Sequence, residues 1–132
     1  MLKHAETTGK IIKAFFTVYN DLGYGFLEKV YENALVLELG ALGLSVEQQM
    51  PISVYYRGVL VGDYFADLVI ADCVIVELKS AEGISRAHEA QLVNYLKATS
   101  YEVGLLLNFG KTAEYKRKIF DIRGTNAVLS DQ

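Results

Sequence analysis

Two stretches in the middle of the chain decide its fold: Gly62-Asp63-Tyr64-Phe65-Ala66-Asp67-Leu68-Val69-Ile70 and Cys73-Val74-Ile75-Val76-Glu77-Leu78-Lys79. Both are rich in β-forming residues and only two residues separate them, which is typical of two strands joined by a hairpin. Each also carries ionisable side chains, and burying an unpaired charge costs several kcal/mol unless a partner, water or a metal ion compensates it. We therefore expect Asp67, Glu77 and Lys79 to converge on one divalent-cation site.

The position of Asp67 relative to Glu77 depends on the hairpin turn. A strict two-residue turn at Ala71-Asp72 would pair Asp67 with Val76 and send the two acids to opposite faces of the sheet. A three-residue turn that includes Cys73, or a bulge, pairs Asp67 with Glu77 and puts them together. A metal site requires the second arrangement, and we predict it.

Length and composition indicate a single domain over residues 1–132. Of the 132 residues, 52% are hydrophobic and 22% are charged, as in ordinary folded proteins. No apolar run approaches the roughly 20 residues that a membrane span needs, and residues 1–6 have no signal-peptide core. One cysteine, Cys73, excludes an intramolecular disulfide and fits a reducing compartment. We expect a cytoplasmic protein.

The net charge of −3 excludes a protein that coats nucleic acid through bulk positive charge. A local basic patch would still allow contact with phosphate, because a bound cation neutralises acids around a metal site. The basic stretch over residues 111–123 is the candidate for such a patch, and a solvated C-terminal face is the alternative. Its basic residues are Lys111, Lys116, Arg117, Lys118 and Arg123.

Hydrophobic periodicity predicts the order helix, helix, three strands, helix, strand. The helices are expected over residues 6–22, 26–42 and 86–99, and the strands over residues 46–56, 59–70, 73–79 and 101–109. Pro51 favours an edge position or a break in the first strand, and Gly62 favours a bulge in the second. Ser85 is a plausible N-cap for the last helix.

This order predicts an α/β fold with a mixed sheet. The first three strands form an antiparallel meander. The helix over residues 86–99 suits a right-handed crossover that places the last strand parallel to strand 73–79. The basic, partly aromatic stretch after Gly110 adds one further helix or strand.

The acids on the hairpin suit a hard cation. Two carboxylates about one coordination sphere apart favour Mg²⁺ or Mn²⁺, and the carbonyl of Leu78 is a further candidate ligand. Lys79 is then placed to orient or deprotonate a water, or to offset charge on a phosphorane-like transition state, which describes phosphodiester hydrolysis. The alternative is a cross-strand salt bridge at the sheet edge. The triplet alone is unspecific, because Glu114-Tyr115-Lys116 also fits; the position at the end of an apolar strand distinguishes Glu77-Leu78-Lys79.

Three helical residues are further candidates. Glu28 falls at the margin of the apolar stripe of helix 26–42, so geometry leaves it open between a surface acid and a site residue. Gln91 and Tyr95, one turn apart, lie beside the buried stripe of helix 86–99, where a hydrogen-bonded contact between helix and sheet is the simplest role.

Asp67 followed by Glu77-x-Lys79 resembles the signature of the PD-(D/E)xK nuclease superfamily, and the predicted order of elements resembles its restriction-endonuclease-like core. The segment from Gln91 to Tyr95 resembles the Gln-x-x-x-Tyr element of RecB-type members. Residues 25–32, 88–92 and 104–110 look like the small GxxExxR proteins of that superfamily. Tyr31 stands where those proteins would have Arg, so no role of that Arg is carried over. The resemblance covers residues 6–120.

The resemblance implies a metal held by Glu28, Asp67 and Glu77. It also implies that Lys79 acts on the water or the phosphate, and that Gln91 and Tyr95 position the phosphodiester or support Lys79. The leading hypothesis is thus a nuclease that hydrolyses DNA with Mg²⁺ or Mn²⁺ as cofactor. The alternative is a catalytically inactive nucleic-acid-binding or protein-interaction module on the same fold. A homodimer that cuts branched DNA is a third hypothesis, because so small a domain has little surface with which to grip a duplex.

Overall fold

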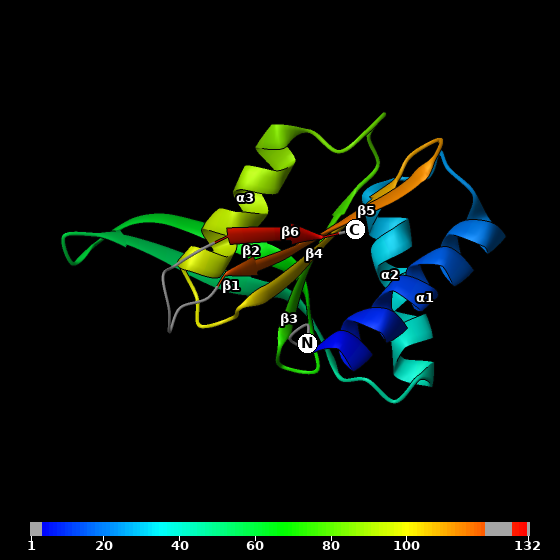
Figure 1. The fold of residues 1–132 in the computed structure, drawn as a ribbon, viewed down its shortest axis with the longest axis horizontal. Helices are drawn as coiled ribbons and strands as arrows, with labels where there is room; N and C mark the ends of the chain where they lie inside the picture. The colour runs from blue at the N-terminus through cyan, green and yellow to red at the C-terminus, as the bar shows by residue number, and fades with distance from the viewer. Residues whose placement is uncertain (1–3, 121–127, 132) are drawn as a thin grey trace.

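The computed structural model describes residues 4–120 and 128–131, which form three helices and six strands (Figure 1). In chain order these are α1 (Ala5–Leu22), α2 (Glu28–Ala41), β1 (Val46–Tyr56), β2 (Val59–Ile70), β3 (Val74–Lys79), α3 (Arg86–Lys97), β4 (Val103–Phe109), β5 (Ala113–Phe120) and β6 (Val128–Asp131). The predicted order of elements is confirmed, and the predicted bounds differ by no more than two residues at either end of each element. None of the described helices is long and apolar enough to cross a bilayer.

The strands form one sheet in the order β1-β2-β3-β4-β5-β6. Every neighbouring pair is antiparallel except β3 and β4, which are parallel and are joined by the crossover through α3. The predicted α/β class with a mixed sheet is therefore confirmed. The stretch after Gly110, predicted as one further element, supplies the two strands β5 and β6.

Helices cover both faces of the sheet, with α1 and α2 on one side and α3 on the other (Figure 1). Alternation along β3 serves both layers: Val74 and Val76 pack with α1 and α2, whereas Ile75 packs with α3. All seven residues of β4 are buried, as expected for a strand covered on both faces. Each buried aliphatic side chain contributes roughly 1.5–3 kcal/mol relative to exposure. The site described below is built on this rigid centre.

The hairpin of β1 and β2 forms one edge of the sheet and extends beyond the helices (Figure 1). Pro51 lies in the edge strand β1, which is one of the two positions predicted for it and the usual place for a proline in a sheet. The register shifts by one residue at Val54 and Tyr55, opposite the Val61-Gly62 step, so the predicted bulge is also confirmed.

Two local features hold α3 against the sheet. Ser85 caps it as predicted: its Oγ accepts a hydrogen bond from the His88 N–H at 3.1 Å, and the Ser85 N–H donates to His88 Nδ1 at the same distance. Gly104 on β4 lets the helix approach closely, because a Cβ there would lie 2.7 Å from the Leu92 side chain. These contacts fix the face of α3 that carries Gln91 and Tyr95.

Candidate active site

The turn between β2 and β3 has the predicted three residues. Ile70 pairs with Val74 and Leu68 with Val76, which places Asp67 opposite Glu77 in the same register. Ala71 and Asp72 have φ of 52° and 53°, a left-handed conformation that the Cys73 N–H stabilises by donating to the Ile70 carbonyl at 3.0 Å. The register required by the metal-site hypothesis is present.

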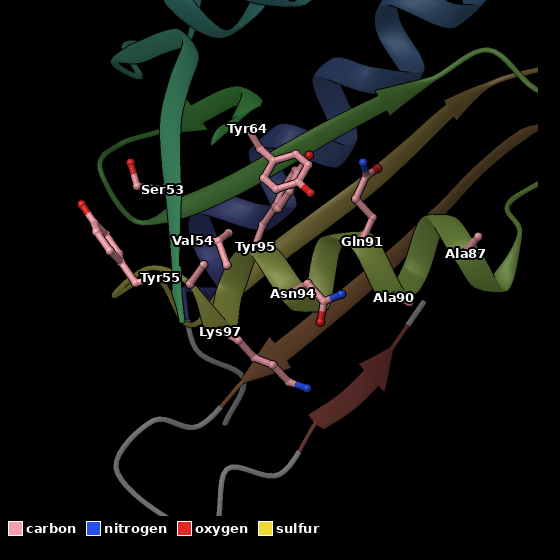
Figure 2. Close-up of a pocket in the computed structure, with 11 residues that line it drawn as sticks. Ser53, Val54, Tyr55, Tyr64, Ala87, Ala90, Gln91, Asn94, Tyr95 and Lys97 are labelled. Atoms are coloured by element: carbon pink, nitrogen blue, oxygen red, sulfur yellow. The ribbon is translucent and has the colours of Figure 1, made fainter. Parts of the chain in front are cut away.

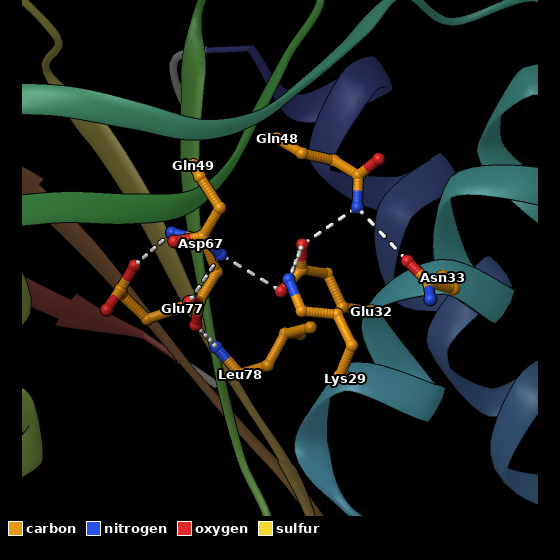
Figure 3. Close-up of polar contacts among 8 residues, drawn as sticks. All are labelled: Lys29, Glu32, Asn33, Gln48, Gln49, Asp67, Glu77 and Leu78. Atoms are coloured by element: carbon orange, nitrogen blue, oxygen red, sulfur yellow. Dashed lines mark hydrogen bonds and ion pairs between the residues drawn. The ribbon is translucent and has the colours of Figure 1, made fainter.

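The carboxylates of Asp67 and Glu77 bridge β2 and β3 where the backbone ladder between them stops, next to the pair Leu68 and Val76 (Figure 3). The Asp67 N–H donates to Glu77 Oε2 at 2.8 Å, and the Leu78 N–H donates to Asp67 Oδ2 at 2.8 Å. Each acid therefore satisfies a backbone donor on the other strand, and each keeps a second oxygen. That oxygen of Glu77 accepts no hydrogen bond from the described residues, and that of Asp67 has only a long contact of 3.4 Å with Gln49.

Burial and mutual repulsion disfavour the charged forms of both acids. Glu77 is 4% exposed, and its burial, followed by the charge of Asp67, raises its pKa from 4.5 to about 8. Burial also raises the pKa of Asp67, although the hydrogen bonds from Leu78 and Gln49 act in the opposite direction. The charge of Lys79 lowers the pKa of both acids by less than burial raises it. A further cation is needed to hold both carboxylates ionised near neutral pH.

Lys79 is connected to α3 through Gln91. Its Nζ donates to Gln91 Oε1 at 3.3 Å, and Tyr95 lies one turn further along the same helix. Burial, together with the charges of Glu77 and Asp67, raises the pKa of Tyr95 to about 12. Tyr95 is therefore a hydrogen-bond donor at any ordinary pH. The structure thus brings Asp67, Glu77, Lys79, Gln91 and Tyr95 into one neighbourhood.

Helix α2 contributes two acids with different environments. Glu28, its first residue, is exposed, and its charge adds to the rise in the pKa of Glu77. Glu32, one turn later, is 3% exposed and accepts hydrogen bonds from Lys29 at 3.0 Å, Gln48 at 2.8 Å and Gln49 at 3.0 Å (Figure 3). Of the two, Glu28 is the acid with freedom to reorient.

Gln49 links the second acid of α2 to the hairpin acids. It has a φ of 54°, and its Nε2 contacts both Glu32 at 3.0 Å and Asp67 at 3.4 Å. Sequence reasoning missed both Gln49 and Glu32. The one available signal for Glu32 is its spacing of four residues from Glu28, which puts both on one helix face.

The comparisons with known proteins agree with this geometry. A family model described as the PD-(D/E)XK nuclease superfamily matches residues 5–119. The chain belongs to this superfamily. A solved structure titled "Crystal structure of SSO0001" has 19% sequence identity and a TM-score of 0.51, with 67% of this chain covered. The match covers 48% of that protein, so the chain spans about half its length, and the likeness is one of fold. The comparison with curated proteins gave no significant match.

The site of this PD-(D/E)XK protein has donors that fit a divalent metal. PD-(D/E)XK nucleases usually use divalent metals. Among residues 4–120 and 128–131, however, no three acidic, histidine or cysteine side chains lie close enough together to hold an ion as they stand. Two carboxylates do meet, Asp67 and Glu77, each with an oxygen left over from backbone bonding. Such a pair of oxygen donors, with little positive charge nearby, fits a hard divalent cation.

A buried amide orders the loop that follows Lys79. Asn108 on β4 lies beside Lys79 in the parallel register and is fully buried. Its Oδ1 accepts from the Ala81 N–H at 2.9 Å, and its Nδ2 donates to the Ala81 carbonyl at 3.0 Å. This pair of bonds fixes the backbone two residues beyond Lys79. The signal in the sequence is a lone amide at the end of an otherwise apolar strand.

The described part of the candidate basic stretch, residues 111–120, forms neither a single patch nor a fully solvated face. Arg117 and Lys118 are neighbours on β5 and point to opposite faces of the sheet. Arg117 donates to Thr8 on α1 at 2.9 Å, and Lys118 donates to Glu89 on α3 at 2.6 Å; both are buried. Lys111 and Lys116 are more accessible, and Arg123 lies outside the described residues.

Proposed function

We propose that this PD-(D/E)XK protein is a metal-dependent nuclease that hydrolyses phosphodiester bonds in DNA. The observation that carries the proposal is the paired insertion of Asp67 and Glu77 between β2 and β3, with Lys79 beside them. A structural salt bridge would leave the acids neutralised by Lys79. Instead both acids keep a raised pKa, and Lys79 is directed to Gln91.

The metal ligands in this proposal are the carboxylates of Asp67, Glu77 and Glu28 and the carbonyl of Leu78. A bound Mg²⁺ or Mn²⁺ would withdraw charge from the phosphate and lower the pKa of a water molecule. Glu28 is exposed and has no hydrogen bond to the described residues, so its side chain is free to turn toward the pair. The Gln49 amide contacts both Glu32 and Asp67, so Glu32 restricts Asp67 through Gln49.

The chain's own residues supply the rest of the chemistry. Lys79 carries the positive charge nearest the acids, and Gln91 orients its ammonium, so it is placed to hold the attacking water or to stabilise negative charge on the phosphate. Hydrolysis adds the water oxygen to phosphorus and breaks the bond to the leaving sugar oxygen, which must gain a proton. Tyr95, which stays protonated, is a donor for a phosphate oxygen.

Incubation of linear, nicked and branched DNA with the protein and Mg²⁺ or Mn²⁺ tests the proposal. We expect cleavage that chelator abolishes and that falls about 100-fold or more in Lys79→Ala, the usual range for loss of an electrostatic stabiliser. Lys13→Ala, which removes an exposed lysine of α1, is the matched control and should cleave like the wild type.

Two outcomes would contradict the nuclease. Cleavage that survives chelator or Lys79→Ala would indicate a contaminant or a different site. Binding of DNA with no cleavage in either metal would support the inactive nucleic-acid-binding module on the same fold.

A further inference from the structure

A cavity of about 800 Å³ opens between the β1–β2 hairpin and α3 (Figure 2). Its volume falls in the range of ligand-binding pockets, about 300–1,000 Å³. The hairpin side is formed by Ser53, Val54, Tyr55 and Tyr64. The helix side is formed by Ala87, Ala90, Gln91, Asn94, Tyr95, Lys97 and Ala98. The small alanines on the helix leave space beside the ring of Tyr64, whereas the ring of Tyr55 points away from α3 (Figure 2).

Aromatic rings form the apolar part of this cavity. The ring of Tyr64 lies 5.8 Å from that of Tyr95 and is tilted 45° to it, so Tyr95 supports Tyr64 from beneath. Tyr64 remains 48% exposed. An exposed aromatic ring at the mouth of a cavity suits a flat, conjugated ligand that stacks on it.

The polar groups of the cavity suit the edges of such a ligand. Asn94 is exposed on α3, and its amide offers both a donor and an acceptor, as base edges require. Lys97 supplies a positive charge at the rim, and none of the described residues that line the cavity is acidic. An anionic polymer with flat heterocycles therefore meets a lysine and no carboxylate among the residues that line this cavity.

The cavity shares two residues with the neighbourhood of the candidate active site. Gln91 and Tyr95 line it, Gln91 accepts a hydrogen bond from Lys79, and the charges of Glu77 and Asp67 act on Tyr95. A ligand bound in the cavity would thus lie next to the residues that handle the phosphate. Tyr64 and Tyr55 belong to neither the acidic pair nor the Lys79–Gln91 contact.

We infer that this cavity binds an unstacked nucleobase of single-stranded DNA, one that adjoins the phosphate to be cut. The inference rests on the proposed function and names its substrate class. Bases in an intact duplex have both faces stacked and present only their edges, whereas a single strand can place a base on Tyr64. Stacking on an aromatic side chain is tolerant of sequence, because every base has a π-face.

Fluorescence anisotropy with a labelled 12-nucleotide oligothymidylate tests this inference, at low salt and with chelator so that no cleavage occurs. Tyr64→Ala should weaken binding at least about fivefold, whereas Tyr64→Phe should bind like the wild type because the ring is kept. Tyr56→Ala is the matched control: Tyr56 is an exposed aromatic of the same hairpin that does not line the cavity, and we expect no change. An oligonucleotide with abasic sites should bind the wild type as weakly as oligothymidylate binds Tyr64→Ala.

Equal binding by Tyr64→Ala and wild type, no loss with abasic sites, or tighter binding of a matched duplex would overturn the inference. Because binding is measured without metal, the result is separate from cleavage. If the wild type cleaves DNA and Tyr64→Ala binds as tightly as the wild type, the base-binding inference is wrong and the proposed nuclease activity is retained. If binding depends on the Tyr64 ring but no cleavage occurs, the base-binding inference is retained and the nuclease activity is wrong.

Discussion

Glu77 makes a hydrogen bond between two strands, but its charged form is disfavoured in the folded protein. Its carboxylate accepts the Asp67 N–H at 2.8 Å, yet it is buried and next to a second acid. The folded state therefore favours the neutral form and raises the pKa of Glu77 to about 8. This is the arrangement expected where a protein gives up stability for a site that binds a cation.

We predict that Glu77→Gln stabilises the metal-free protein at high pH. The wild-type carboxyl contributes stability fully below its ordinary pKa of 4.5, and that contribution is lost as the pH rises through about 8. Glutamine keeps an acceptor for the Asp67 N–H and does not ionise. In urea unfolding with chelator present, the variant should gain about 2–4 kcal/mol over the wild type at pH 9 and little at pH 4.

We predict that Glu89→Gln changes stability with pH in the opposite direction to Glu77→Gln. Its ion pair with Lys118 lowers the pKa of Glu89, so the pair stabilises the protein above pH 4.5 and the contribution is lost as pH falls through the folded pKa. This variant should be less stable than the wild type at neutral pH, with the difference shrinking in acid. A gain from Glu77→Gln that does not grow with pH would contradict the role assigned to burial.

Residue-level predictions from sequence succeeded where chemistry restricted the choice. Asp67 and Glu77 could be paired in advance because two acids on apolar strands need a shared environment, which a strict two-residue turn does not provide and a three-residue turn or a bulge does. Glu32 could not be found, because its burial depends on Gln48 and Gln49 from a strand at least sixteen residues away. Sequence periodicity does not specify the register between a helix and a strand.

At the scale of elements, the hydrophobic pattern was sufficient for most helices and strands. The exception lies in β5, where Lys116, Arg117 and Lys118 follow one another and these charges obscure the alternation of a strand. Arg117 and Lys118 are each bonded to a helix on their own face of the sheet, to Thr8 of α1 and Glu89 of α3. Successive side chains of a strand point to opposite faces of the sheet, so these two adjacent cations make separate buried contacts and do not form one charged surface.

We predict that Gly110→Ala disturbs the loop after β3. A Cβ at Gly110 would lie 2.2 Å from the Ala81 carbonyl oxygen, the same oxygen that accepts from Asn108. The loop must move, which breaks that bond and costs about 1–3 kcal/mol as an overpacked position. If the site is a nuclease, cleavage should fall as well, since Lys79 lies two residues before Ala81.

Gly40→Ala is the matched control in thermal unfolding. Gly40 lies within α2, and a Cβ there would meet no atom within 4 Å. The substitution should stabilise the helix by up to about 1 kcal/mol. A Gly110→Ala protein as stable as the wild type would show that the loop carries no constraint.

At the scale of the whole molecule, the charge distribution opposes an anionic substrate. The net charge is −3, and Glu28, Glu32, Asp67 and Glu77 lie around the proposed phosphate site. Within the described residues, the basic stretch over residues 111–120 does not form one surface that would offset them. Lys79 is the cation beside the two hairpin acids, and a bound metal ion would add to its charge.

We predict that Mg²⁺ or non-cleaving Ca²⁺ tightens DNA binding at constant ionic strength. Added salt alone should weaken binding, because it competes with the few phosphate contacts that this chain can make. A cation between the acids reverses the local sign of the field, so affinity should rise severalfold despite that competition.

The double variant Asp67→Asn, Glu77→Gln is the control, because it removes two carboxylate charges. Divalent ions should change its affinity for DNA only as much as NaCl of the same ionic strength does. Anisotropy titrations in NaCl and in MgCl₂ of matched ionic strength separate the two effects. Equal curves for wild type would mean that the acids hold no cation when DNA binds.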